Sequence, residues 1–529
     1  KRNRQNSKMK FFISDTKKLE HKYGKWFWYA DSECSLYANN EHFVIYAGYT
    51  IGDETIEQII QRDPHELEQA NGTYWAVIMT EESCKVIVDY FCQTKIFYRS
   101  NEAIEISNAL YLFPFTSKDV DRQEVEKRLK ISSDKKEYQP TESFEKWETM
   151  VLDWGYASSP SLGVRQYSPS MCRTVFKDTY ILQPDHCLIA TEDVKIQRIH
   201  DTQQWIKDSL RTKHDMSKEQ IQDKIHRCMK EHADLIKIKY KNIVSSLSEG
   251  IDSVLQDQYF PDAEKIMYDF QPSNAPFTYK QKAIDKTKNK KCKVEKFVLH
   301  KDVIEKTAST VMNDPSCFYW DTLPSQQQLH NLEVKPDILM YGQNGDNMFM
   351  HKPFFYYEYM FTKQIAKDIP VKQKLAEFDK TLTSFQNCYS SVNNIWDRPA
   401  ATWQEAFPDM TQEQLIEELE NDPVDAYIDD FARKNTPGLY NREVSHAGDV
   451  LVTSLFCDKR IFTLVMSAKD DIMLESIMDA KIQKDILKNK FDYQYETPHK
   501  DQAEFNAVHI IKPMYVSTIR HCLKDHLEQ

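Results

Sequence analysis

The first two hundred residues alternate short apolar runs with polar turns. Apolar runs lie at 43–46, 73–79 and 85–88, and the dipeptide Asn71-Gly72 comes directly before the second of them. Runs of this length, rich in β-branched and aromatic residues and bounded by turn residues, are typical of antiparallel strands. From about residue 9 to 190 the sequence therefore predicts an antiparallel sheet unit.

After about residue 200 the pattern changes to helices that alternate with isolated apolar runs. Ser217 and Gln220 form a capping-box pair, and Ile221, Ile225 and Met229 follow at helical spacing. This pattern predicts an amphipathic helix that begins just after Ser217.

Three apolar runs after this helix predict strands at 243–247, 265–270 and 294–299, with a further helix from about Tyr279. Beyond about residue 350 the pattern is mostly helical. Alternation of strands and helices is typical of a parallel sheet, whose binding turns lie at the carboxyl ends of its strands. The turn after 243–247 is therefore a candidate binding site.

Composition limits the function classes. The chain has 529 residues and a formal charge of −12, which argues against a large nucleic-acid face because such faces need clustered Lys and Arg. No apolar run approaches the ~18 residues needed to cross a bilayer, so no membrane partner is expected. The chain has 11 cysteines and no C-x-x-C pair, which favours a reduced, cytoplasmic protein. The oligomeric state stays open.

The first candidate turn is Ser248-Glu249-Gly250-Ile251-Asp252-Ser253. A strand that enters a tight turn before a helix can direct backbone N–H groups and the helix N-terminus at phosphate oxygens. An aspartate in such a turn can hold Mg²⁺. On these residues alone, an ordinary strand-to-turn junction is an equal alternative.

A second turn follows the apolar run 338–341. Gly342 and Gly345 lie on either side of Gln343 and Asn344, and Asp346 comes next. Two glycines allow the backbone to approach a bound phosphate closely, and Asp346 could then face a metal ion.

The order of these motifs resembles the asparagine synthetase superfamily, which includes asparagine synthetases, β-lactam synthetases and lasso-peptide cyclases. The family's pyrophosphate loop L-S-G-G-x-D-S is similar to 247–253, and its turn G-x-G-[AG]-D-E-L-F is similar to 342–349. Later stretches similar to P-F-L-D-x-R, K-x-L-L-R and P-x-K lie at 455–460, 484–488 and 498–500. In the amino-terminal half, segments 72–76, 88–98 and 174–188 resemble those of the family's glutaminase-type domain.

The resemblance implies a two-domain α/β fold. Residues 9–200 would form an Ntn-hydrolase-like (glutaminase-like) α/β sandwich. Residues 201–529 would form an adenine nucleotide α-hydrolase-like (PP-loop ATP pyrophosphatase) domain with a parallel sheet and a helical carboxyl-terminal part. The implied activity is ATP-dependent amide-bond synthesis, in which a small-molecule or peptide carboxylate is adenylated, AMP and pyrophosphate are released, and an amine captures the acyl group.

The resemblance also assigns roles to individual residues, with ATP and Mg²⁺ as the cofactors. Asp252 and Asp346 would hold Mg²⁺, Lys500 would offset charge at the reacting centre, and Gln343 stands where asparagine synthetases carry a glutamate. The residues expected at the nucleotide are Ser248, Glu249, Gly250, Asp252, Ser253, Gly342 and Gly345.

Three departures from the family pattern keep alternatives open. Glu249 replaces a glycine and adds a carboxylate close to the expected phosphates, while Asn344 and Asn347 replace a glycine and a glutamate of the second turn. A catalytically silent binding or assembly module is one alternative. An ammonia-dependent asparagine synthetase is another, disfavoured by Gln343.

The glutaminase reaction itself is not expected. In the family its nucleophile is a cysteine exposed as the mature amino-terminal residue, where the free α-amine serves as the base. Here the chain begins with Lys1, and the first cysteine is Cys34. The resemblance therefore implies a retained sandwich without its reaction.

Overall fold

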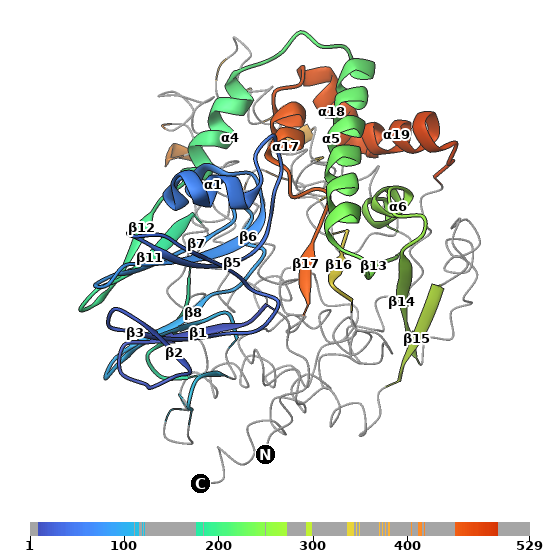
Figure 1. Cartoon of the computed structure of the whole chain (residues 1–529). Helices are drawn as coiled ribbons and strands as arrows, with labels where there is room; N and C mark the ends of the chain where they lie inside the picture. The colour runs from blue at the N-terminus through green and yellow to red at the C-terminus, as the bar shows by residue number, and fades with distance from the viewer. Residues whose placement is uncertain are drawn as a thin grey trace.

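The computed structural model describes residues 9–109, 176–271 except 183, 184 and 249, 292–298, 336–342 and 450–495, with short or isolated positions between 112 and 121 and between 345 and 417. Within these residues the protein combines two antiparallel sheets from the amino-terminal part with one parallel sheet from the later part (Figure 1). The mixed α/β class predicted from the sequence is confirmed at this level.

The first antiparallel sheet has six strands in the order β10-β8-β9-β1-β3-β2. All neighbouring strands in it run antiparallel. Its strands are β1 (Phe11–Ser14), β2 (His21–Tyr23), β3 (Trp26–Ala30), β8 (Phe97–Ser100), β9 (Ile104–Ser107) and β10 (Thr179–Ile181).

The second antiparallel sheet also has six strands, in the order β12-β11-β7-β6-β5-β4. One face packs on the first sheet through a core that includes Trp26 and Trp75, and the other face packs on helix α1 (Ile56–Arg62) and the 3₁₀ turn η1 (Pro64–Gln69). Because both faces are covered, β6 is buried along its whole length and reads as a continuous apolar run. The strands are β4 (Ser35–Ala38), β5 (Phe43–Thr50), β6 (Gly72–Met79), β7 (Cys84–Val88), β11 (His186–Ala190) and β12 (Val194–Arg198).

The third sheet has five parallel strands in the order β15-β14-β13-β16-β17. Its first strand in the sequence lies in the middle, and the later strands extend the sheet on either side. The order therefore reverses between β13 and β16, which makes this junction a topological switch point. The strands are β13 (Ile243–Ser246), β14 (Glu264–Gln271), β15 (Cys292–Val298), β16 (Ile338–Met340) and β17 (Leu451–Thr453).

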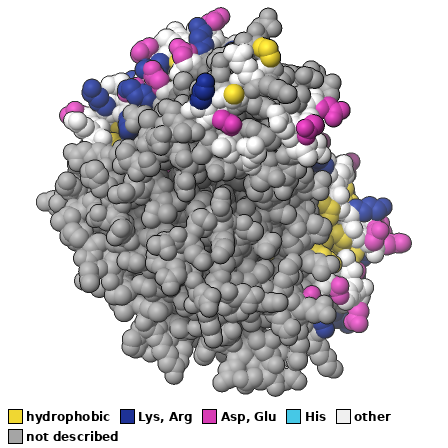
Figure 2. Space-filling view, turned by 180° about the vertical axis from the view of Figure 1, so that it is seen from behind, with side chains coloured by type: hydrophobic (Ala, Val, Ile, Leu, Met, Phe, Trp, Pro, Cys, Tyr) yellow, Lys and Arg dark blue, Asp and Glu magenta, His cyan; other side chains and the backbone are white. Residues whose placement is uncertain are grey.

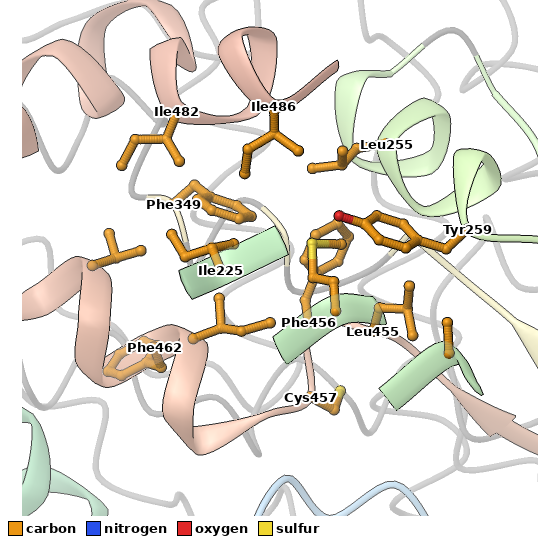
Figure 3. Packing of buried hydrophobic residues seen from close by; sticks show 14 of the residues in the cluster. Ile225, Leu255, Tyr259, Phe349, Leu455, Phe456, Cys457, Phe462, Ile482 and Ile486 are labelled. Atoms are coloured by element: carbon orange, nitrogen blue, oxygen red, sulfur yellow. The ribbon is translucent and has the colours of Figure 1, made fainter. Parts of the chain in front are cut away.

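Helices cover one face of the parallel sheet (Figure 1). The capping box predicted at Ser217 and Gln220 is present, and Ile221, Ile225 and Met229 are buried as their spacing predicts. Figure 3 shows Phe349, Leu455, Ile482 and other apolar side chains from separate segments converging on one cluster. The helices are α4 (Thr202–Arg211), α5 (Lys218–Lys239), α6 (Ile251–Gln258), α17 (Lys459–Met466), α18 (Asp470–Asp479) and α19 (Lys481–Phe491).

Asp458 links the amino-terminal sandwich to the later part of the chain. Its buried carboxylate caps α17, accepts hydrogen bonds from the Arg460 guanidinium and accepts one of 2.9 Å from the Asn71 amide. The Asn71 amide oxygen in turn accepts a hydrogen bond from the backbone N–H of Lys459. The Asn-Gly turn predicted from the sequence therefore also serves as a contact between distant parts of the chain.

A buried polar cluster lies close to this link. The hydroxyl of Thr73 lies 2.7 Å from that of Thr453, and the hydroxyl of Tyr49 lies 2.7 Å from Nε2 of His232 on α5. His232 is completely buried, and this burial lowers its pKa to about 4. The imidazole is therefore neutral in the folded protein at neutral pH.

This histidine should make the stability depend on pH. An unfolded histidine titrates near pH 6.5, so the unfolded state binds a proton at a higher pH than the folded state does. The contribution of His232 to the free energy of unfolding is therefore fully present above pH 6.5 and is lost as the pH falls toward 4. We expect the stability advantage of wild type over His232→Gln, measured by urea denaturation, to shrink by about 2 kcal/mol between pH 7 and pH 5. Titration of the other groups affects both proteins alike, so a constant difference would contradict the assignment.

On the described part of the face seen from behind, Lys and Arg side chains lie among Asp and Glu side chains (Figure 2). Mixed signs weaken the long-range field that a nucleic-acid face needs. Among the helices in the described ranges, none has both the length and the apolar character needed to span a bilayer.

Candidate functional site

The Ser248–Ser253 loop lies at the carboxyl end of β13, at the switch point of the parallel sheet. Leu247 still hydrogen-bonds to β14 through its N–H, and the chain then turns so that α6 begins at Ile251. The N-cap is Gly250, so no side-chain oxygen satisfies the first turn of this helix. A helix N-terminus without a side-chain cap retains N–H groups that suit an anion.

Two serine side chains brace the loop. The Ser253 hydroxyl is buried and lies 2.7 Å from the Ser248 hydroxyl and 2.9 Å from the Gly250 carbonyl oxygen. It also accepts a hydrogen bond of 3.1 Å from the Ser248 N–H. Ser248 and Gly250 themselves are exposed. Ser253 thus holds the loop in place from its buried side, while Ser248 and Gly250 remain accessible to a ligand.

The second glycine turn packs directly on this loop. A Cβ atom on Gly342 would lie 2.8 Å from the backbone nitrogen of Ser253, and one on Gly345 would lie 2.2 Å from the Asp252 carboxylate. Side chains at these two positions would displace the loop, so both glycines are needed for the close approach. Two turns that are about ninety residues apart in the sequence are therefore parts of one site.

Asp252 lies in the first turn of α6 and is half-buried. Its Oδ1 accepts a hydrogen bond from Nε2 of Gln483 on α19. Gln483 is not among the site residues predicted from the sequence, although it directly precedes the 484–488 stretch. Its neighbours Ile482 and Ile486 are buried four residues apart, a spacing that could have placed Gln483 beside the core-facing side of the helix.

A buried ion pair holds α6 against the sheet. Asp257, near the end of α6, pairs with Lys265 of β14, and both side chains are almost fully buried. Burial raises the pKa of the Asp257 carboxyl, and the Lys265 ammonium opposes that shift. The pair fixes the helix whose first turn carries Asp252.

The described donors fit a Mg²⁺ ion that is shared with phosphate. Among the residues in the described ranges, no cluster of three His, Cys, Asp or Glu side chains could hold a metal alone. Mg²⁺ is commonly held by one or two carboxylates together with phosphate oxygens. Asp252 provides such a carboxylate beside an uncapped helix N-terminus. Because Gly345 has no side chain, the Asp252 carboxylate can lie against its backbone.

The other predicted site residues lie outside the described residues. They are Glu249, Gln343, Asp346 and Lys500, together with Asn344 and Asn347 of the second turn. The helix predicted from about Tyr279 is outside them as well. The structure thus brings together Ser248, Gly250, Asp252, Ser253, Gly342 and Gly345.

Cys34 lies in the sandwich, away from this site. Its Sγ lies 3.5 Å from the Lys10 carbonyl oxygen and 3.5 Å from Asp31. Burial, reinforced by the Asp31 charge, raises the thiol pKa far above its ordinary value. The thiol is therefore protonated at neutral pH and lacks the thiolate character of a nucleophile.

Comparisons with known proteins give distant structural likenesses, among them the two that follow. No protein-family model matches the chain, and no curated protein matches it in sequence. One likeness is to the glutamine phosphoribosylpyrophosphate (PRPP) amidotransferase from B. subtilis complexed with ADP and GMP, with 11% identity, 40% of this chain and 42% of that chain covered, and a TM-score of 0.16. The chain thus matches less than half of that amidotransferase.

Another likeness is to a structure described as the allosteric regulatory enzyme of purine biosynthesis. It has 9% identity, covers 55% of this chain and 75% of that chain, and has a TM-score of 0.20. With TM-scores this low, neither likeness defines the activity of this chain.

Proposed function

We propose that the protein is an ATP-dependent synthetase that adenylates a carboxylate and transfers the acyl group to an amine. The supporting observation is the position of the Ser248–Ser253 loop. It lies at the switch point between β13 and β16, with Gly342 and Gly345 packed on it. In open parallel sheets, ligands bind at this point, outside the carboxyl ends of the strands.

The proposed chemistry uses the loop to hold the leaving group. A carboxylate oxygen attacks the α-phosphorus of ATP, and the bond to the bridging oxygen breaks to release pyrophosphate. The amine then attacks the acyl carbon and releases AMP, while the amine proton passes to solvent. The pyrophosphate would be bound by Ser248, Gly250 and Ser253. Asp252 would hold Mg²⁺, which offsets the negative charge that builds on the leaving pyrophosphate.

Residues outside the described ranges complete this proposal. Asp346 would share the metal, Lys500 would stabilise charge on the reacting groups, and Gln343 would lie beside the acyl group, as the family resemblance implies. The amino-terminal part would be an Ntn-hydrolase-like sandwich that supports the synthetase part, and the later part would be of the PP-loop type.

The first test is ATP binding by wild type and Ser253→Ala in calorimetric titrations with Mg²⁺. Removing the hydroxyl that braces the loop should weaken ATP binding about fivefold, since one such hydrogen bond contributes ~1 kcal/mol. Ser467→Ala is the matched control, because Ser467 is equally buried and donates to the Ser209 carbonyl, away from the loop. Wild type that binds no ATP at millimolar concentration would refute the proposal.

A silent nucleotide-binding module is the second candidate. Glu249 favours it, because an additional carboxylate in a phosphate loop opposes a triphosphate electrostatically. AMP release in the presence of candidate carboxylates and amines separates the two functions. ATP binding with no AMP formed under any substrate mixture would select the silent module.

A further inference from the structure

The side-chain amide of Gln483 is buried, but only one of its two polar atoms makes a hydrogen bond within the described residues. The side chain is completely buried, and its Nε2 donates to the Asp252 carboxylate. Its Oε1 is buried too and has no hydrogen-bond partner in the described structure. A buried amide oxygen without a partner is uncommon and calls for a ligand or an ordered water.

The backbone of α19 is fixed by contacts on both sides of Gln483. Ile482 and Ile486 are completely buried in the core cluster, where Figure 3 shows them facing Phe349 and Leu255. Two residues after Gln483, Asp485 accepts a hydrogen bond of 2.9 Å from the Gln222 amide of α5. The Gln483 amide can therefore rotate about its terminal bond while its helix stays in place.

Rotation of this amide would exchange one type of contact for another. With Nε2 toward Asp252, the amide donates to the carboxylate. After a half turn, Oε1 takes the place of Nε2 and lies beside a carboxylate oxygen. Adjacent oxygen ligands of an octahedral Mg²⁺, each about 2.1 Å from the metal, are about 3 Å apart, which is close to a hydrogen-bond distance.

We infer that Gln483 is a metal ligand, which supplies its amide oxygen to the Mg²⁺ held by Asp252. The inference rests on the proposed function, because the metal is the one bound with the nucleotide. Without metal, the amide donates to Asp252 and keeps the carboxylate in its place. With metal, the rotated amide would add a neutral oxygen, and oxygen is the ligand atom that a hard cation such as Mg²⁺ takes.

The experiment measures the affinity of the full chain for Mn²⁺, a substitute for Mg²⁺, by electron paramagnetic resonance with and without pyrophosphate. Gln483→Met keeps the length and removes the oxygen, and it should weaken Mn²⁺ binding about 10- to 100-fold. Gln483→Glu supplies a charged oxygen and should bind Mn²⁺ at least as tightly as wild type. Gln222→Met is the control, since it breaks the other amide–carboxylate contact of α19 and should leave the affinity unchanged.

The outcomes separate this inference from the proposed function. Mn²⁺ bound by Gln483→Met as tightly as by wild type, but lost in Asp252→Asn, would overturn the role of Gln483 and leave the site intact. Wild type that binds no Mn²⁺ under either condition would overturn both. A Gln483→Glu protein whose melting temperature rises more with Mn²⁺ than that of wild type would support the ligand role independently of affinity.

Discussion

Replacing Asp252 with Asn should lower the rate of AMP and pyrophosphate release by about 10² or more. The substitution keeps the shape of the side chain and removes the charge that would hold Mg²⁺ against the departing pyrophosphate. Preorganised electrostatic contacts of this kind commonly contribute at least that factor to a rate. The measurement is AMP and pyrophosphate formed from ATP with candidate carboxylates and amines present.

Asp485→Asn is the control for this change. Asp485 also accepts a hydrogen bond from a glutamine amide, but it pairs with Gln222 and Lys481, away from the loop. Its variant should turn over at the wild-type rate. AMP and pyrophosphate released by Asp252→Asn at the wild-type rate would exclude the proposed role of Asp252, and ADP and phosphate as the products would exclude the adenylation mechanism.

Replacing Asp458 with Ala should reduce the free energy of unfolding by about 3 kcal/mol. The carboxylate is completely buried and accepts hydrogen bonds from Arg460 and Asn71. Removing it takes away one hydrogen-bond acceptor from the Arg460 guanidinium and one from the Asn71 amide. The effect should lie at the low end for buried pairs, because Arg460 is about one-third exposed (37%) and keeps a 2.7 Å contact with Glu231. Urea denaturation measures the loss.

Glu231→Gln provides the matched comparison, since it removes the other carboxylate bound to Arg460. Glu231 is half-exposed, and such ion pairs contribute ~0–1 kcal/mol. Equal losses in the two variants would show that the buried contact between the sandwich and α17 has no special importance.

Much of the fold could be predicted because local patterns agree with the tertiary contacts. The run 73–79 is apolar after Thr73 because β6 is covered on both faces, and the helix after Ser217 carries its own capping box. The strands predicted at 243–247 and 265–270 correspond to β13 and β14. The strand order is not encoded locally, because β13 pairs with β16, a strand about ninety residues later in the sequence.

The candidate site was predictable only in part for the same reason. Glycines and small polar residues after strands mark turns, so Ser248–Ser253 and Gly342 could be found from the sequence. The contact of Gly345 with Asp252 depends on the sheet order, and Gln483 approaches from a helix more than two hundred residues away. The spacing of Ile482 and Ile486 indicates the core-facing side of that helix, but it does not show which distant residue Gln483 contacts.

The long distance between Asp252 and Gln483 also sets an order of events during synthesis. At roughly 5 to 20 residues per second, α6 leaves the ribosome on the order of ten seconds or more before α19 is made. Until then the apolar side of α6, including Leu255, lacks the Ile482 and Ile486 side chains that cover it in the finished protein. The nascent chain therefore passes through a stage in which this apolar side of α6 lacks the cover that α19 later provides.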